Sequence, residues 1–161
     1  MIGQAIVYET LDRMNIPYQV IEHAPMFTIE DMMRMDIPPD AVIAKNLFLR
    51  DSKGRRHYLV VVHKDNNPDL RGMGKQWGTR LSFASDARLE KYLGLTKGSV
   101  SPFGVLNDAE CEVEVYFDNA LLECTRVGVH PNLNTASLLM AFPDIVRVVR
   151  EHGNKVEFFD A

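Results

Sequence analysis

The sequence has no long apolar run and only two cysteines among its 161 residues. No segment approaches the roughly 18 consecutive apolar residues that a membrane-spanning helix needs, so we expect no membrane partner. The first residues, MIGQAIVYETLDRM, carry Glu9 and Asp12 and lack the basic leader and apolar core of a secretion signal. We therefore expect a cytoplasmic protein.

Cysteine is too scarce to form a disulfide framework. Cys111 and Cys124 flank the run EVEVYFDNALLE, where they could meet across a hairpin. In a reducing compartment, two buried thiols are the default expectation, ahead of a disulfide or a reactive thiol.

Familiar catalytic signatures are also missing. The sequence contains no GxxxxGK[ST] phosphate-binding loop, no nucleophile elbow, no HExxH, no CxxC and no dinucleotide-binding glycine fingerprint. Gly72 and Gly74 in RGMGKQWG supply only a fragment of a glycine pattern. The five histidines lack the short spacing of zinc ligands, so we expect neither a metal site nor a cofactor.

Composition indicates one folded unit. The chain is 46% hydrophobic and 25% charged, which is enough to bury a core, and its length is usual for one domain. We expect a single soluble domain over residues 1–161.

Charge is divided unevenly along the chain. The formal net charge is −4, but residues 1–44 carry −5, residues 45–97 carry +7 and residues 98–161 carry −6. The twelve cations of the middle third could form one phosphate-facing surface or be scattered over solvated faces, and charge alone leaves both readings open. They are Lys45, Arg50, Lys53, Arg55, Arg56, Lys64, Arg71, Lys75, Arg80, Arg88, Lys91 and Lys97.

Hydrophobic spacing and turn residues predict alternating helices and strands. The predicted helices cover residues 2–14, 28–35, 69–78 and 85–93, and a last one begins near Pro143. The predicted strands cover residues 18–23, 42–51, 55–63, 81–83, 112–118 and 155–159. Because Ser52–Gly54 joins two of these strands as a hairpin, we expect an α/β fold with a mixed, largely antiparallel β-sheet surrounded by helices.

Two segments of this pattern carry further expectations. The alternation in EVEVYFD turns Val113 and Val115 inward and Glu112 and Glu114 outward, so these glutamates are expected on a solvated face rather than as a catalytic pair. The loop GSVSPFGVLND has no charge from residue 98 to residue 106 and is therefore expected to be packed or functional.

Lys45 and His130 are the candidate functional side chains. Lys45 interrupts the apolar strand pattern VIAKNLFLR, where an ammonium must pair, reach solvent or face a cleft. His130 precedes Pro131, which holds its backbone extended and can direct amide groups at a ligand. Taken singly, each also fits a structural role: a lysine at the edge of the core and an ordinary turn.

Three ordered segments resemble the YbaK/ProX family of aminoacyl-tRNA deacylases, in particular its free-standing ProX and PrdX-type members. They are AKNLFLRD around Lys45, GSVSPFGVLND from Gly98, and GVHPNLNTASL from Gly128. The resemblance covers nearly the whole chain and includes EHAP and the region of Thr28. It implies a pocket that cleaves the ester between tRNA and a small amino acid.

The resemblance also implies site residues and partners. It makes Lys45 the catalytic candidate and tRNA(Pro), held by its acceptor end, the partner, and it allows a transient association with prolyl-tRNA synthetase. The expected substrate-binding residues are Thr28, Asn46, Gly98, Ser99, Ser101, Pro102, Gly128, Val129, His130 and Pro131.

Such a site needs no protein nucleophile, because an aminoacyl ester is already activated. Backbone amides and a cation suffice to orient a water or the ribose hydroxyl and to stabilise the oxyanion. By family analogy the expected substrate is Ala-tRNA(Pro), with Cys-tRNA(Pro) as the alternative, in a pocket that excludes the larger correct residue. Two further readings are a non-catalytic adaptor for tRNA or an aminoacyl ligand, and an interaction domain using the methionines of residues 26–35.

Overall fold

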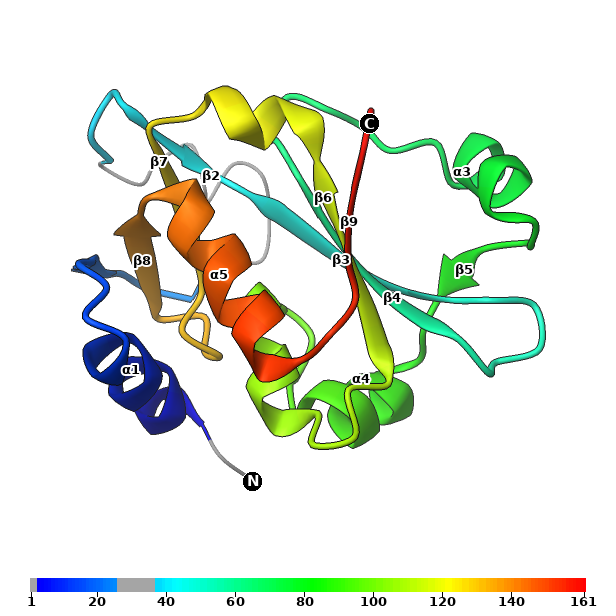
Figure 1. Cartoon of the computed structure of the whole chain (residues 1–161), viewed down its shortest axis with the longest axis horizontal. Coiled ribbons are helices and arrows are strands. Elements are labelled where there is room, and N and C mark those ends of the chain that lie inside the picture. The colour runs from blue at the N-terminus through cyan, green and yellow to red at the C-terminus, as the bar shows by residue number, and fades with distance from the viewer. Residues whose placement is uncertain (1–2, 26–36) are drawn as a thin grey trace.

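The computed structural model describes residues 3–25 and 37–161, which form two mixed β-sheets with helices packed around them (Figure 1). The strands are β1 Gln19–Glu22, β2 Ala41–Ile43, β3 Lys45–Arg50, β4 His57–Val62, β5 Ser82–Phe83, β6 Val113–Asp118, β7 Arg126–Val129, β8 Ala136–Met140 and β9 Val156–Phe159. The α-helices are α1 Gln4–Arg13, α3 Leu70–Trp77, α4 Asp86–Leu93 and α5 Phe142–His152, and the 3₁₀ helices are η1 Pro102–Asn107 and η2 Asn119–Glu123.

The predicted α/β class with mixed strand pairing is confirmed, but the strands form two sheets instead of one. The four-stranded sheet has the order β1-β8-β7-β2, and its β2–β7 pair is parallel. The five-stranded sheet has the order β5-β3-β4-β6-β9, with antiparallel pairs around β3 and parallel pairs on both sides of β6. The predicted β3–β4 hairpin is present in the second sheet.

The prediction of one continuous strand over residues 42–51 was wrong. Ile43 pairs with Gly128 in the four-stranded sheet, whereas Lys45 pairs with Val62 in the five-stranded sheet. Between them, the Ala44 amide donates a hydrogen bond to the Gly128 carbonyl (3.1 Å). The apolar run therefore crosses from one sheet to the other, and hydropathy does not reveal the crossing because both halves are buried strands.

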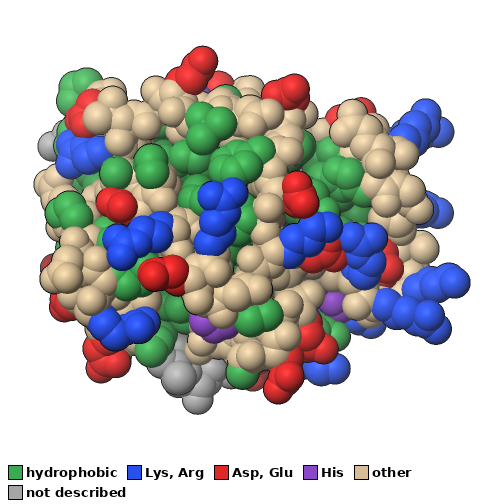
Figure 2. Space-filling model, viewed as in Figure 1, with side chains coloured by type: hydrophobic (Ala, Val, Ile, Leu, Met, Phe, Trp, Pro, Cys, Tyr) green, Lys and Arg blue, Asp and Glu red, His purple; other side chains and the backbone are tan. Residues whose placement is uncertain are grey.

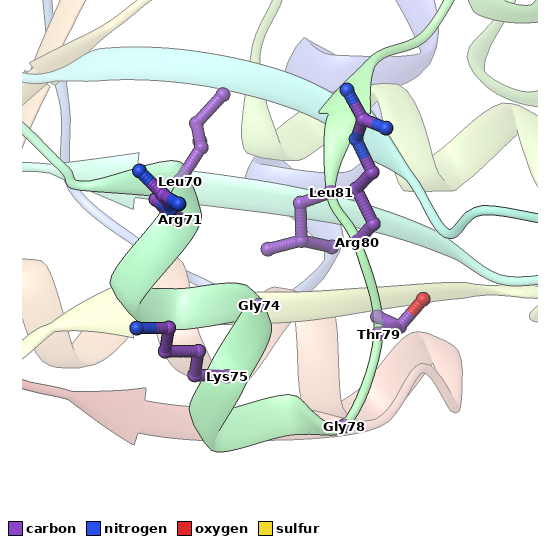
Figure 3. Close-up of a pocket in the computed structure, with 8 residues that line it drawn as sticks. All are labelled: Leu70, Arg71, Gly74, Lys75, Gly78, Thr79, Arg80 and Leu81. Carbon is purple, nitrogen blue, oxygen red and sulfur yellow. The ribbon is translucent and has the colours of Figure 1, made fainter.

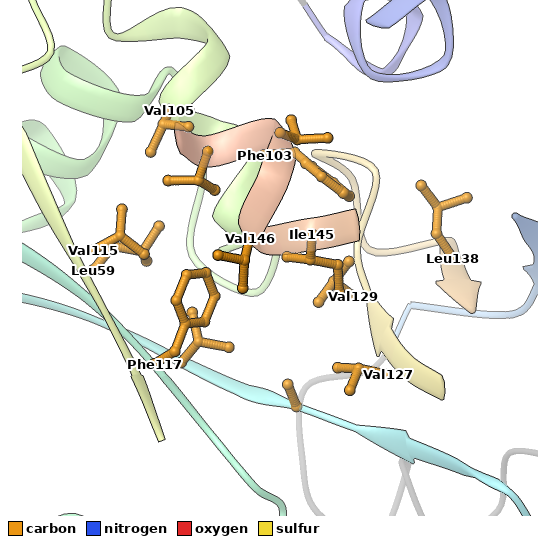
Figure 4. Close-up of a cluster of buried hydrophobic side chains, with 14 of the residues drawn as sticks. Leu59, Phe103, Val105, Val115, Phe117, Val127, Val129, Leu138, Ile145 and Val146 are labelled. Carbon is orange, nitrogen blue, oxygen red and sulfur yellow. The ribbon is translucent and has the colours of Figure 1, made fainter. Parts of the chain in front are cut away.

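The main core lies between the two sheets and α5 (Figure 4). β4 and β6 contribute Leu59 and Phe117, and η1 contributes Phe103, all fully buried. α5 covers this core as predicted, with Pro143 in its first turn. Its buried residues are Phe142, Ile145, Val146, Val148 and Val149.

A second core covers the opposite face of the five-stranded sheet, beneath α3. Tyr58 and Tyr116 from the strands pack there against Trp77 of α3, with ring centroids 5.4 and 4.1 Å from the indole. Glu114 belongs to this face and is not solvated as predicted: its side chain is 14% exposed and accepts hydrogen bonds from Arg56 at 2.7 and 2.9 Å. The alternation of residues along β6 predicted the correct face for Glu114, but α3 and the Arg56 side chain cover this face of the sheet.

Most local predictions are confirmed. α1, β1 and β9 lie where they were expected, and α4 begins at Ser85, whose hydroxyl accepts from the Arg88 amide, and ends at Gly94 in the left-handed region (φ 65°). Ser85 and Gly94 satisfy groups that a helix end leaves unpaired. The helix predicted over residues 28–35, with its methionines, lies outside the described residues.

The two cysteines do not meet across a hairpin, in line with the default expectation of two thiols. β6 is followed by η2 and then by β7 of the other sheet, so Cys111 and Cys124 are separate free thiols, each partly buried. In the described ranges 3–25 and 37–161, no helix has the length and hydrophobicity to cross a bilayer.

Candidate active site

Lys45 begins β3 directly after the crossing between the sheets. Its ammonium donates a hydrogen bond to Asn67 Oδ1 (3.2 Å), and the residue is half-buried. Strand alternation places Lys45 on the face of Leu47 and Leu49, which pack in the core beneath α3. The charge is therefore held at the boundary between core and solvent, where a polar partner can be exchanged for a substrate.

Asn46 leaves the same strand on the opposite face, as expected for a regular strand. Its Oδ1 atom is buried and has no hydrogen-bond partner among the described residues. A buried amide oxygen without a donor costs free energy, and such atoms warrant an explanation. Lys45 and Asn46 therefore do not act from one side of the strand.

Gly128 lies in the middle of β7, between β2 and β8. A Cβ atom here would lie 2.3 Å from Ile43 Cδ1 and 3.0 Å from Leu139 Cδ2, so a larger residue would force these side chains to shift. Its carbonyl receives the Ala44 amide, which joins this motif to the one around Lys45. Val129 follows it in the main core and is 2% exposed, so its side chain is structural.

The His130 ring is oriented by its own loop. Nδ1 lies 3.0 Å from the Ala136 carbonyl oxygen, and because a carbonyl only accepts, Nδ1 carries the proton. Burial lowers the pKa of His130, and His23, whose ring centroid is 6.2 Å away, lowers it further, although the bond to Ala136 acts in the opposite direction. The imidazole is therefore neutral at pH 7, and Nε2 is left as a hydrogen-bond acceptor.

His23 and Ser137 stand beside His130, and sequence reasoning did not single them out as site residues. His23 Nδ1 bonds to the Ala24 carbonyl (2.8 Å), so Nε2 accepts from the Ser137 hydroxyl (3.0 Å). Ser137 lies on β8, and the His23 amide donates to Thr135 (2.9 Å). His23 belongs to the EHAP motif that the sequence analysis noted, but only the β1–β8 pairing places this histidine next to His130.

Ser101 joins the uncharged loop to the His130 turn. It is completely buried, its hydroxyl donates to the His130 carbonyl (2.5 Å), and it accepts from the Phe103 amide (3.2 Å). The loop is packed, as predicted. Because both bonds occupy the hydroxyl, Ser101 fixes the position of the turn.

Asn132 makes a second connection between the same two loops. Its backbone is left-handed (φ 64°), a conformation that asparagine tolerates better than most residues. Its Nδ2 donates to the Phe103 carbonyl (3.3 Å), and its Oδ1 is buried with no partner in residues 3–25 and 37–161. Sequence reasoning missed this residue because its contact is 29 residues away.

The remaining predicted residues line the same two loops or fall outside the structure. Gly98 has a positive φ of 92°, which favours glycine, and Ser99 is 6% exposed with its amide bonded to Thr96 (3.0 Å). Pro102 and Pro131 are buried, Pro102 in the first turn of η1. Thr28 lies outside the described residues.

A buried carboxylate supports the loop that holds Lys45. Asp118 is 1% exposed and accepts from the His63 amide (3.0 Å), from Asn66 Nδ2 (2.6 Å) and from the Ala120 amide (3.0 Å). These bonds lower its pKa against the opposing effect of burial. The charged carboxylate therefore fixes the turn from which Asn67 reaches Lys45.

The described side chains offer no activated thiol and no metal site. Burial raises the pKa of Cys111 and of Cys124, so both are protonated at pH 7. Residues 3–25 and 37–161 contain no group of three or more His, Cys, Asp and Glu residues placed to bind a metal ion. The candidate residues thus fall into two groups: Lys45 with Asn67 on the face of the second core, and the neutral His130 with the two loops that Ser101 joins.

Residues of these kinds suit the class of proteins that position a substrate which is already reactive. A family model described as the aminoacyl-tRNA editing domain matches residues 23–148. The chain belongs to this family, in its YbaK/ProX type. The membership confirms the expected enzyme class, an aminoacyl-tRNA deacylase.

Two relatives show how far the similarity extends. The chain is 52% identical over 152 residues to the prolyl-tRNA editing protein ProX of Acetoanaerobium sticklandii. The alignment covers 94% of this chain and 92% of that protein. It is 34% identical over 146 residues to the prolyl-tRNA synthetase associated domain-containing protein 1 of Danio rerio, covering 89% of this chain and 79% of that protein.

A solved structure shares the fold. It describes a candidate trans-editing enzyme for prolyl tRNA synthetase, with a TM-score of 0.72 and 21% sequence identity, and the match covers 98% of this chain and 96% of that one. At this identity the likeness concerns the fold alone.

Proposed function

We propose that the chain removes the amino acid from mischarged tRNA(Pro) in trans, with Ala-tRNA(Pro) as its substrate. The names of the bacterial and vertebrate relatives support the connection to prolyl-tRNA. The observation that most supports the proposal is the bond from the Ala44 amide to the Gly128 carbonyl, which links the residue before Lys45 to the strand that leads into the His130 turn. In this proposal residues 1–161 act as one editing domain in the cytoplasm, where tRNA is charged.

The proposed reaction is hydrolysis of the ester between the amino acid and the terminal ribose. A water oxygen adds to the carbonyl carbon, the carbonyl becomes an oxyanion, and the bond to the ribose oxygen then breaks. The proton lost by the water ends on the ribose oxygen, giving free amino acid and tRNA. The neighbouring ribose hydroxyl can orient the water, so no covalent enzyme intermediate is needed.

Lys45 is assigned the positive charge of this site. A substrate that displaces Asn67 from the ammonium gains a charge-assisted hydrogen bond at the oxygen where negative charge develops. Backbone amides of the two clamped loops are the second source of donors. His130 Nε2, an acceptor at neutral pH, faces a proton-bearing group such as the ammonium of the esterified amino acid.

Selection by size is assigned to the walls of the site. Gly98, Ser99 and Pro102 belong to one packed loop, and Gly128–Pro131 form the end of β7 and the turn that follows it. Because Ser101 ties these loops together, a larger amino acid cannot be accommodated by moving one loop alone. A pocket of fixed size admits alanine and rejects the larger proline, as in double-sieve editing.

Loss of ester from charged tRNA tests the proposal. The purified protein is incubated with Ala-, Cys- and Pro-charged tRNA(Pro), and the remaining ester is followed with time. We expect rapid loss of alanine and slow loss of proline. Faster loss of cysteine than of alanine would change the substrate, whereas tight tRNA binding without hydrolysis of any ester would favour a non-catalytic adaptor.

Lys45→Ala should lower kcat for Ala-tRNA(Pro) by roughly 100-fold or more, the usual effect of removing a donor to the oxyanion. The domain should remain folded, because the Lys45 side chain is only half-buried. Lys91→Ala, an exposed position on α4, is the matched control and should retain wild-type turnover. Equal turnover of both variants would remove Lys45 from the mechanism.

A further inference from the structure

A hollow of about 870 Å³ lies between α3 and the segment that follows it, and the described residues that line it include none of the predicted site residues (Figure 3). Its walls include Arg71 and Lys75 of α3, and the segment Gly78–Leu81 lies opposite. In Figure 3, Arg71 and Lys75 leave the helix on the side away from the segment Gly78–Leu81, and Arg80 points upward along that segment.

Two glycines build the hollow. A Cβ atom on Gly74 would lie 2.4 Å from the Thr79 carbonyl oxygen, so the segment approaches the helix more closely than any other residue allows. The Thr79 amide donates to the Gly74 carbonyl (2.9 Å), and Gly78 turns the chain with a left-handed φ of 72°. The glycines of RGMGKQWG match no known sequence motif, but Gly74 and Gly78 are needed for the close approach and the turn at this hollow.

Arg71 and Lys75 are four residues apart and share a helix face, so their charges stand one turn from each other. Neither forms an ion pair or a side-chain hydrogen bond with any described residue, whereas Arg56 and Arg126 each pair with a carboxylate. The walls of the hollow carry no acidic side chain; Asp69 precedes the helix and lies beside Gly72. Neighbouring cations that lack a carboxylate partner attract a polyanion.

The position of α3 relates these cations to the candidate active site. Asn67, which accepts from Lys45, lies three residues before the helix, and Thr79 after the helix accepts from the Ser52 amide (3.3 Å) at the hairpin. β3 runs from Lys45, which contacts Asn67, toward the hairpin residue Ser52, which contacts Thr79. The strand spans about 17 Å at ~3.3 Å per residue. α3 therefore runs beside β3, from the Lys45 end toward the hairpin.

Cationic side chains gather at this end of the molecule. Figure 2 shows Lys and Arg side chains of the visible face concentrated where α3, β5 and the tip of the β3–β4 hairpin lie in Figure 1. Phe83 on β5 is 62% exposed, so it offers an aromatic ring to a base. These cations are spread along one end of the molecule, and an aromatic ring is exposed beside them. Such an arrangement suits a nucleic-acid strand better than a small anion.

We infer that Arg71 and Lys75 form an RNA-docking surface that binds the sugar–phosphate backbone of the tRNA at a distance from the ester. The identity of the RNA rests on the proposed function, but the binding itself does not require hydrolysis. The surface contributes affinity rather than chemistry, because phosphate contacts position the RNA without touching the reacting atoms.

The test measures binding of uncharged tRNA(Pro) transcript by fluorescence anisotropy at 50 to 200 mM salt. Each phosphate contact contributes roughly 0.7–0.9 to the slope of log K against log salt, so Arg71→Gln combined with Lys75→Gln should reduce the slope by about 1.5. Over this range the double variant should lose roughly eightfold less affinity than the wild type. With Ala-tRNA(Pro), KM should rise more than kcat falls.

Arg147→Gln combined with Arg150→Gln on α5 is the matched control, since it also removes two helix cations. An unchanged salt slope for the α3 variant, or an equal change for the α5 variant, would overturn the inference. Loss of binding to prolyl-tRNA synthetase with RNA binding intact would do the same. If the wild type fails to hydrolyse the ester but its RNA affinity depends on α3, the surface stands and the proposed function fails.

Discussion

Ser101→Ala isolates the clamp between the two loops of the candidate active site. The substitution removes one oxygen atom, which donates to the His130 carbonyl and accepts from the Phe103 amide. Ser101 is 0% exposed, so water does not reach either partner in place of the hydroxyl. Two buried backbone groups therefore lose a hydrogen bond together.

The magnitude follows from that count. A buried polar group left without a partner costs roughly 1–3 kcal/mol, so Ser101→Ala should lower the free energy of unfolding by about 2–6 kcal/mol. Domains of this size have a free energy of unfolding of about 5–15 kcal/mol, so most of this range leaves the variant folded. With an m value of ~2 kcal/mol/M, the urea midpoint should fall by about 1–3 M.

Urea unfolding of wild type, Ser101→Ala and Ser99→Ala measures this effect. Ser99 is a suitable control because it lies in the same loop, is 6% exposed and forms no side-chain hydrogen bond within the described part of the chain. Its variant should change the free energy of unfolding by less than about 1 kcal/mol. If the two variants unfold at the same urea concentration, the clamp does not hold the loops as argued.

Two further predictions concern α3 and the buried histidine at the start of β4. Gly74→Ala should destabilise the fold by roughly 1–3 kcal/mol, because the added Cβ would meet the Thr79 carbonyl oxygen. Gly72→Ala is the control and should be neutral or stabilising, because its Cβ would meet only the Asp69 side chain. Equal thermal midpoints for the two variants would contradict this prediction. Burial, with a smaller effect of a nearby arginine, lowers the pKa of His57, so the unfolded chain binds the proton more readily than the folded one. Stability should be fullest above about pH 6.5 and fall as the pH drops toward the folded pKa, and His57→Phe should flatten this dependence in urea unfolding at pH 5.5 to 7.5; an unchanged dependence would count against the assignment.

Local sequence determined the elements. Periodicity and capping residues predicted α1, α4 and α5, because a helix depends on neighbours three and four residues away and on groups at its ends. The β3–β4 hairpin followed from two apolar runs around Ser52–Gly54. Three motifs sufficed for the family, which the comparisons confirmed.

Alternation was informative only in part. It predicted which face of β6 Val113 and Val115 occupy, but it placed Glu114 in solvent. Exposure depends on what covers a face, and here α3 and Arg56 cover it. The same limit applies to the charged middle third: Arg88 bonds to the Gly54 carbonyl and to His57, so part of that charge is used inside the fold.

By itself the sequence thus determined helices α1, α4 and α5, the hairpin, the mixed α/β class and the family, since these depend on short-range pattern and on motif order. The tertiary structure alone decided that the chain changes sheets at Ala44, that Ser101 holds the His130 turn, and that Gly74 brings Thr79 against α3. The crossing and the clamp join residues that are 84 and 29 positions apart, and the approach of Thr79 depends on how α3 packs on the sheet. No local pattern encodes such contacts, because they form only when separate elements pack together.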